Sequence, residues 1–277
     1  MDAENMMRTG KYAFLTLDFE PDHCDLVKGN HYDAFRGIPK FLGMIRSRGI
    51  TVTVFATGIV LEEREADIRT LVEAGAEVEL HSYSHKRGTN GITEITKGIE
   101  AYRRIFGRSP KGYRAARGMI SDEEIACLAA QGFHFDSSLF PSFFPGRFCN
   151  IAKPTAPFFY PGTSLLEIPF SVISRIRFPV SLSYIQLAGF PTFRALKCIF
   201  GLPDILIIDL HLHDLFPPDI FRSLPVKWKL VYSRCFMRHR ERGLNDLEDL
   251  IRMLEGEGYT FGILGDLYRD YVKAAGI

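Results

Sequence analysis

The chain has 277 residues, of which 46% are hydrophobic and 24% are charged, and its formal net charge at pH 7 is +1. This composition is typical of a globular protein with a sizeable core, and the near-zero charge gives no indication of a nucleic-acid partner. The five cysteines are scattered and include no CxxC pair, which argues against a disulfide framework and favours a reducing compartment.

The ends and the hydropathy pattern give a second indication of location. The first dozen residues carry acidic groups and no apolar segment of the signal-peptide kind. The chain also has no run of about 18 uncharged apolar residues, the length that a spanning helix needs. We therefore expect a soluble, cytoplasmic protein.

A succession of apolar strand, polar loop, helix and glycine recurs along the first half of the chain. Strands are predicted at 12–17, 50–55, 77–80, 111–114 and 133–135, and helices at 33–48, 65–74, 93–106 and 121–131. Thr93 is a plausible N-cap, and Ser121 begins a capping box. Further on, strands are predicted at 204–213 and 259–264, with a helix at 244–257 between them. This order indicates parallel βα units, most simply a barrel or a doubly wound sheet.

The segment 140–200 differs in character from the rest. It is rich in Phe, Pro and Ile, carries scattered Arg and shows little periodicity. No linker or internal repeat interrupts the chain. We expect one domain over residues 1–277, with an irregular apolar insertion at 140–200.

The first strand ends in polar residues that do not belong in a pure core. Asp18 and Glu20 project to the same side of an extended segment. Two carboxylates placed together repel unless a cation lies between them or one is protonated. The alternative is an acidic turn that caps the next segment.

His81 and His85 follow the third predicted strand and are four residues apart. That spacing suits one divalent ion, and two histidines with a carboxylate leave coordination positions open for water, as in catalytic metal sites. The alternative is a polar loop with two solvated histidines.

The late strand alternates between ionisable and apolar residues. Asp209, His211 and His213 share one face, and strongly apolar flanks favour a cavity lining over an exposed edge. Arg114 and Asp136 also stand where strands should end. An arginine near Asp18 would keep that carboxylate ionised, and an aspartate beside a histidine would fix its tautomer. Either could instead belong to a surface ion pair.

In order and spacing these segments resemble the motifs of the NodB-homology polysaccharide deacetylases, carbohydrate esterase family four. The shared features are the Asp-containing strand end, the His-x-x-x-His pair, an Arg loop, Asp-Ser-Ser at 136–138 and Glu-Ile-Pro at 167–169, together with a late histidine segment, Leu210-His211-Leu212-His213, where the family has Leu-x-His. The resemblance extends over roughly Tyr12 to Tyr268. It implies a distorted (β/α) barrel of about seven strands, with the site at the carboxyl ends of the strands.

The resemblance also implies a role for each matching residue. His81 and His85 match metal ligands, and Asp18 matches the catalytic base. The remaining catalytic positions are Arg114, which holds the base, Asp136, which orients the late histidine, and His213, the general acid.

Three departures from the family pattern leave alternatives open. Phe19 stands where a second aspartate usually binds the metal, so Glu20, or less favourably Asp22, becomes the third ligand. Ala116 replaces the usual proline of the arginine motif. His211 is the alternative to His213 as the acid.

The activity implied is metal-dependent hydrolysis of an N-acyl group, acetyl first, from an amino sugar, with Zn²⁺ expected and Co²⁺, Ni²⁺ or Mn²⁺ as alternatives. A deformylase or other C–N amide hydrolase on the same scaffold would keep the same residues. A catalytically silent sugar-binding protein is the non-enzyme alternative, because the changes at Phe19 and Ala116 could mean lost activity.

The substrate is predicted from composition and location. A cytoplasmic protein is poorly placed for an extracellular polymer. Arg175, Arg177 and Arg194 lie among apolar residues, and 227–242 is basic. A lipid-linked sugar, with peripheral contact at the inner membrane face, is therefore a hypothesis. The alternative is that these apolar residues complete the barrel core while the cations are solvated at its rim. The sequence does not indicate the oligomeric state.

Overall fold

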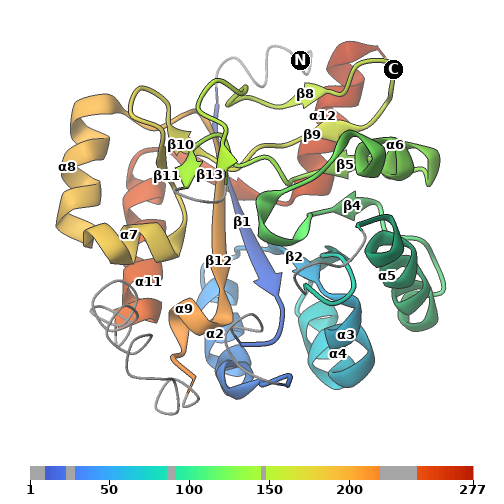
Figure 1. The fold of residues 1–277 in the computed structure, drawn as a ribbon. Coiled ribbons are helices and arrows are strands. Elements are labelled where there is room, and N and C mark those ends of the chain that lie inside the picture. Colours follow the sequence, from blue (N-terminus) through green and yellow to red (C-terminus); the bar gives the residue numbers. More distant parts are fainter. Residues whose placement is uncertain (1–9, 23–28, 86–90, 145–147, 219–241, 277) are drawn as a thin grey trace.

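The computed structural model describes residues 10–22, 29–85, 91–144, 148–218 and 242–276. Its main sheet has nine strands in the order β12-β1-β2-β3-β4-β5-β9-β8, with β13 also paired to β1. The sheet curls into the distorted (β/α) barrel that the sequence predicted (Figure 1). Its strands are β1 (Lys11–Phe19), β2 (Val52–Ala56), β3 (Glu77–Leu80), β4 (Gly112–Tyr113), β5 (Phe135–Asp136), β8 (Phe158–Phe159), β9 (Leu166–Glu167), β12 (Ile205–His211) and β13 (Tyr259–Gly262).

Strand β1 lies in the middle of this arrangement. One of its edges pairs in parallel with β12 from Tyr12 to Asp18. The other edge pairs first with β13 and then with β2. Between β9 and β12 the barrel wall is completed by Ser171, whose Oγ accepts a 2.7 Å hydrogen bond from the Ile207 N–H. Strand ends from distant parts of the chain are thus brought to the same rim.

The helices of the first half follow one another around the outside of the sheet (Figure 1). A 3₁₀ turn, η1 (Asp33–Gly37), leads into the first of them, and a second, η2 (Ala116–Gly118), precedes α6. As predicted, Ser121 begins α6 with a capping box. Thr93, in contrast, is not an N-cap, because α5 already includes Gly91. The helices are α2 (Ile38–Arg46), α3 (Gly58–Glu63), α4 (Glu65–Glu73), α5 (Gly91–Phe106), α6 (Asp122–Ala130), α9 (Leu212–Leu215), α11 (Gly243–Gly256) and α12 (Leu264–Ala275). Of these, α3, α9 and α12 were not predicted.

The segment expected to be irregular is more ordered than its sequence suggested. It contains the two-stranded pairs β6 (Phe143–Phe144) with β7 (Phe148–Cys149) and β10 (Val172–Ile173) with β11 (Phe178–Pro179). It also contains two helices, α7 (Leu182–Ala188) and α8 (Phe190–Phe200). The periodicity of α8 is weak because Phe193 is its one fully buried residue. The basic stretch 227–242 lies outside the described residues except for Arg242.

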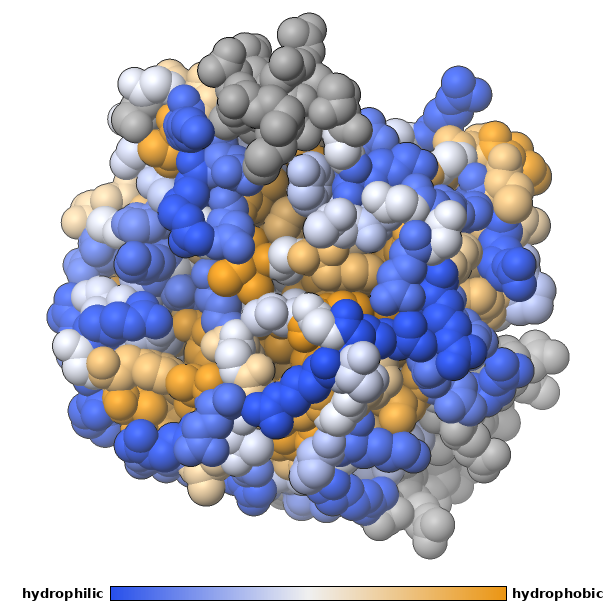
Figure 2. Space-filling model, turned by 180° about the vertical axis from the view of Figure 1, so that it is seen from behind, coloured by the Kyte–Doolittle hydropathy of each residue, from blue (hydrophilic) through white to orange (hydrophobic). Residues whose placement is uncertain are grey.

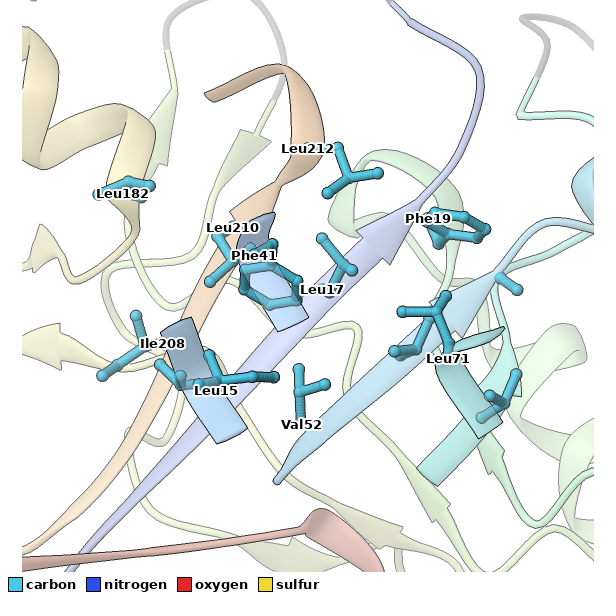
Figure 3. Packing of buried hydrophobic residues seen from close by; sticks show 14 of the residues in the cluster. Leu15, Leu17, Phe19, Phe41, Val52, Leu71, Leu182, Ile208, Leu210 and Leu212 are labelled. Carbon is cyan, nitrogen blue, oxygen red and sulfur yellow. The ribbon is translucent and has the colours of Figure 1, made fainter. Parts of the chain in front are cut away.

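Two apolar layers hold the barrel. On its outer face, Leu15 and Leu17 of β1 and Leu210 of β12 lie near Phe41 of α2 (Figure 3). Inside, a smaller cluster that includes Phe14, Phe55, Phe135 and Ile207 fills the amino-terminal end. Helix α12 closes that end, because its Leu264 N–H donates to Thr53 Oγ1 at 3.0 Å. Polar side chains are therefore left to the carboxyl ends of the strands.

No helix in the described ranges combines the length and the apolar character that crossing a bilayer requires. On the face shown in Figure 2, hydrophilic residues predominate, and hydrophobic residues are visible between them.

Candidate active site

Asp18 points into the barrel from the carboxyl end of β1, on the same side of the strand as Phe14 and Thr16. Arg114 follows β4 and reaches across the barrel, so that its Nη1 donates to Asp18 Oδ1 at 2.6 Å. Burial alone would raise the pKa of Asp18, but the Arg114 charge lowers that pKa to about 2. The structure thus brings together the predicted base and the predicted arginine, and Asp18 is ionised at neutral pH.

The position of Arg114 is fixed by its surroundings. The side chain is fully buried, and its Cζ lies 4.2 Å from the ring centroid of Phe55 and 4.3 Å from that of Phe170. Its Nε donates to the Ser137 carbonyl and its Nη2 to Ser137 Oγ, both at 3.0 Å. A cation held between two rings and saturated with hydrogen bonds has little freedom to move. Arg114 therefore provides a fixed positive charge beside Asp18.

His81, His85 and Glu20 form a compact cluster at the rim. Their nearest ligand atoms all lie within 4.8 Å of one another. His85 Nε2 is 3.1 Å from Glu20 Oε2, and His81 Nε2 is 3.8 Å from the same oxygen. Burial lowers the pKa of both histidines, so both rings are neutral. Neutral imidazole is the form that binds metal ions.

The orientation of His81 is set by its other ring nitrogen. Nδ1 donates a 2.9 Å hydrogen bond to the carbonyl of Arg114. The lone pair of Nε2 therefore faces the cluster, and within the described residues this buried atom has no hydrogen-bond partner. A backbone carbonyl on the distal nitrogen and an open lone pair are the usual setting of a metal-ligating histidine.

Of the two candidate third ligands, the structure brings Glu20 rather than Asp22 to the histidines. Asp22 Oδ2 instead accepts a 3.0 Å hydrogen bond from the Ala34 N–H, and its backbone N–H donates to the His31 carbonyl. Burial raises the pKa of Asp22 to about 6. Asp22 therefore links the residues just after β1 to those around the start of η1.

The backbone that carries the two histidines is strained. Ser82 and His85 have φ angles of 57° and 55°, in the left-handed region that residues with a side chain rarely adopt. Glu94, buried in the first turn of α5, stabilises this loop by accepting hydrogen bonds from the Ser84 N–H at 2.6 Å and from Ser84 Oγ at 3.0 Å. Glu94 was not predicted as a site residue, because no sequence pattern links it to the histidine pair. Strain that the surroundings impose is common at functional sites.

The late histidine that reaches Asp18 is His211. Its Nε2 lies 3.9 Å from Asp18 Oδ2 and 3.7 Å from Glu20 Oε1. His213 lies inside α9, buried, with its ring stacked on that of His211 at a centroid distance of 4.7 Å. The strand ends at His211, so the alternation that placed both histidines on one face stops there. The geometry therefore offers His211 as the proton donor, in the place where the sequence favoured His213.

Asp209 is a second buried carboxylate beside Asp18. Its Oδ1 lies 3.2 Å from Arg114 Nη1. Burial, with the neighbouring Asp18 charge, raises the pKa of Asp209 to about 7. The contact of Arg114 with Asp18 is shorter than its contact with Asp209, so the arginine stabilises the Asp18 carboxylate more. As the pH falls, Asp209 is therefore protonated before Asp18.

The resemblance assigns Asp136 to the late histidine, but in the structure its two carboxylate oxygens face other residues. Its Oδ1 accepts a hydrogen bond from Ser138 Oγ, and its Oδ2 lies 3.1 Å from the Tyr160 hydroxyl. Burial raises the pKa of Asp136 and raises that of its neighbour Glu167 well above the usual range. Because Ser138 Oγ also accepts the Ala115 N–H at 2.7 Å, Asp136 supports the loop that carries Arg114.

The site therefore combines three functions at one rim. A pair of neutral imidazoles and a carboxylate can hold a divalent ion, an ionised aspartate beside them can accept a proton, and a histidine opposite can donate one. This set is suited to hydrolysis of an amide or ester bond.

Comparison with known proteins agrees with this geometry. Residues 8–135 match the family model for polysaccharide deacetylase. A peptidoglycan deacetylase of Helicobacter pylori is 29% identical over 108 residues, which are 37% of this chain and 37% of the relative. The matched part thus spans about a third of the length of the curated relatives.

Solved structures share the fold along almost the whole chain. A probable polysaccharide deacetylase from Pseudomonas aeruginosa superposes with a TM-score of 0.64 at 16% identity, covering 95% of this chain and 91% of that one. A putative polysaccharide deacetylase from Mycobacterium smegmatis gives 0.61 at 19% identity, covering 97% and 92%. The first half of the chain is thus similar to the polysaccharide deacetylases, and almost the whole chain shares the barrel fold of solved structures described as such deacetylases.

Proposed function

We propose that this chain is a metal-dependent hydrolase that removes an N-acyl group, acetyl in the first instance, from an amino sugar. The observation that carries the proposal is the cluster of Glu20, His81 and His85 beside an aspartate, Asp18, that Arg114 keeps ionised. The match of residues 8–135 to the polysaccharide deacetylase family model supports the same chemistry, as does the similar Helicobacter pylori protein, which is named a peptidoglycan deacetylase.

The three ligands fit a divalent transition metal. Two imidazole nitrogens and one carboxylate oxygen suit Zn²⁺, and also Co²⁺, Ni²⁺ or Mn²⁺, with coordination positions left for water and substrate. When bound, such an ion would polarise the substrate carbonyl and lower the pKa of water at the site. The buried Nε2 of His81, which has no hydrogen-bond partner among the described residues, supports this assignment, because such an atom is costly unless something binds it.

The protein's own groups would manage the protons. Asp18 takes the proton of the attacking water, and the guanidinium of Arg114 keeps that carboxylate anionic beforehand. The imidazolium of His211 gives a proton to the leaving amine, as its Nε2 lies on the same rim with 22% of its side chain exposed. The products are the free amino sugar and the carboxylate of the acyl group.

Metal content is the first test. We expect about one equivalent of a divalent transition metal in the purified wild-type protein, by elemental analysis, and at least a tenfold loss in His81→Ala, His85→Ala and Glu20→Gln, in line with the loss of a ligand. His134→Ala is the matched control, because His134 stacks on Tyr268 away from the cluster. Metal that persists in all three variants would contradict the assignment.

Acyl release is the second test. N-acetylglucosamine oligomers should yield acetate, and Asp18→Asn should reduce the rate by about 10²-fold or more while keeping its metal. Formate released from N-formyl substrates, with no acetate from acetylated ones, would favour the deformylase alternative. Sugar binding without metal or hydrolysis would favour a silent binding protein.

The surface of residues 137–203 supports a lipid-linked substrate and contact with a membrane face. This stretch has six basic residues and one acidic residue, Glu167, which is buried. Phe143, Phe144, Ile151 and Ile176 are large apolar residues that remain exposed there. They are neighbours in space, because Ser142 Oγ donates to the Arg177 carbonyl at 2.7 Å. Exposed apolar groups in a predominantly basic stretch suit an anionic lipid surface.

A further inference from the structure

The proton donor His211 has two ring nitrogens with different surroundings. Nε2 faces Asp18 and Glu20, as described above. Nδ1 faces the other way and lies 3.2 Å from Asp214 Oδ2. A histidine that gives its Nε2 proton to substrate needs a fixed ring and a defined tautomer, and the group on Nδ1 sets both.

The carboxylate of Asp214 is itself held in place. It is 1% exposed, and the same Oδ2 accepts a 2.9 Å hydrogen bond from the backbone N–H of His211. The carboxylate therefore binds both the ring and the main chain of that histidine. Because the two residues are only three apart, in the first turn of α9, their relative position depends on local geometry.

The backbone of Asp214 is fixed from two further sides. Gln186 of α7 donates from Nε2 to the Asp214 carbonyl at 3.0 Å. On another side Gly243 packs so closely that a Cβ built on it would lie 2.1 Å from the same carbonyl oxygen. Helix α9 has only four residues, so these contacts with α7 and α11 provide the rigidity that it lacks.

Asp136, the residue that the family resemblance nominates for orienting the late histidine, is engaged elsewhere. Its two oxygens face Ser138 and Tyr160. We therefore propose that Asp214, and not Asp136, is the positioning residue for His211; this inference rests on the proposed hydrolase function. Asp214 accepts a hydrogen bond from Nδ1–H, keeps Nε2 directed at the site and stabilises the imidazolium form before Nε2 gives up its proton.

The test reads the ring nitrogens of His211 directly. The full chain is labelled with ¹⁵N-histidine, prepared free of metal, and the His211 signals are assigned from their loss in His211→Gln. In the neutral ring of the wild type we expect the proton on Nδ1. In Asp214→Ala it should move to Nε2 in most molecules, and Asp214→Asn, which keeps an acceptor oxygen, should restore part of the Nδ1 form. Asp136→Asn is the discriminating control and should leave these signals in place.

A kinetic measurement accompanies the spectra. Asp214→Ala should lower kcat by about 10–100-fold, with KM changed less than threefold and metal content unchanged. Movement of the His211 signals in Asp136→Asn but not in Asp214→Ala would overturn the proposal, as would a wild-type neutral ring protonated on Nε2, a result that does not depend on the Asp214 variants. If the wild type hydrolyses no N-acyl sugar while the tautomer follows Asp214, the positioning contact stands and the proposed function fails.

Discussion

Arg114 concentrates most of the electrostatics of the site in one side chain. Its guanidinium binds Asp18, approaches Asp209 and lies between two phenylalanine rings. A buried ion pair contributes little net stability as a pair, but removing one partner leaves the other charge buried without compensation. The cost of losing Arg114 is therefore mostly the cost of stranding Asp18.

We expect Arg114→Gln to lower the free energy of unfolding by about 3–5 kcal/mol, measured by urea denaturation. Arg104→Gln is the matched control, because Arg104 pairs with Glu62 at 2.8 Å on the surface with 64% of its side chain exposed. Its loss should cost about 1 kcal/mol or less. Similar costs for both variants would mean that Asp18 is solvated in the folded protein.

Glu167 gives a pH-dependent contribution to stability. Burial, followed by the Asp136 charge, raises its pKa well above that of a free glutamate. The folded state therefore holds this proton more tightly than the unfolded state. The resulting stabilisation is complete below about pH 4.5, the ordinary glutamate value, and is lost as the pH rises toward the folded pKa.

Glu167→Gln imitates the protonated form at every pH. Relative to wild type, its melting temperature should rise progressively as the pH increases above the ordinary glutamate pKa of 4.5, by about 2–4 °C for each kcal/mol gained. The measurement is thermal unfolding at a series of pH values. Glu123→Gln, at an exposed position of α6, should follow the wild-type curve. Parallel curves for Glu167→Gln and wild type would show that Glu167 is ionised when folded.

At the scale of residues, the sequence was informative for reactive side chains that stand at the ends of predicted strands. Asp18, Glu20, His81, His85 and Arg114 were nominated from such positions, and the structure brings them together. The partners of Asp136 could not be found in this way, because Tyr160 and Glu167 come from β9 and the loop before it. No local period connects them.

At the scale of elements, short connections decide where side chains point. The sequence pattern continued the late strand to 213, whereas β12 ends at His211 and α9 begins at Leu212. Because of that difference of two residues, His211 and not His213 lies beside Asp18. The elements with a clear period were predicted to within about two residues at most ends, and a four-residue helix has too few residues to show one.

The packing of α11 against α9 can be tested with a glycine pair. Gly243→Ala would drive a Cβ against the Asp214 carbonyl, so we expect a loss of about 1–3 kcal/mol in unfolding free energy. Gly256, the last residue of the same helix, has open space around it. Gly256→Ala should be neutral or stabilise by up to about 1 kcal/mol. Equal changes in unfolding free energy for the two variants, measured by denaturant titration, would indicate that α9 can shift away from α11 without loss of stability.

At the scale of the whole molecule, the charge is unevenly distributed. The 137–203 stretch carries six basic residues and one acidic residue, while the chain as a whole is nearly neutral. We expect the protein to sediment with vesicles that contain anionic phosphatidylglycerol and not with neutral phosphatidylcholine vesicles. The binding should weaken as salt rises from about 0.1 to 0.5 M, because screening shortens the range of the attraction.

Matched variants locate that binding. Lys153→Glu combined with Arg175→Glu should weaken it by about tenfold or more, since each cation near an anionic surface is worth about 1 kcal/mol. Phe143→Ser should weaken it as well, through lost apolar burial. Arg69→Glu and Val72→Ser, at exposed positions of α4, are the controls and should have little effect. If vesicle binding is unchanged in the Lys153→Glu/Arg175→Glu and Phe143→Ser variants, the membrane contact lies elsewhere on the protein.

The pairing of β1 has a consequence for biosynthesis. The strand that carries Asp18 is translated long before two of its partners: one of its edges awaits β12, and the first half of its other edge awaits β13, both from the last third of the sequence. The Thr16 hydroxyl, for example, donates to a carbonyl 192 residues further along. Until those strands are translated, the central strand of the nascent chain exposes apolar side chains and unpaired backbone amides. Holdase chaperones can therefore bind it during much of translation. The rim that carries the candidate site is completed only after β12 has been translated.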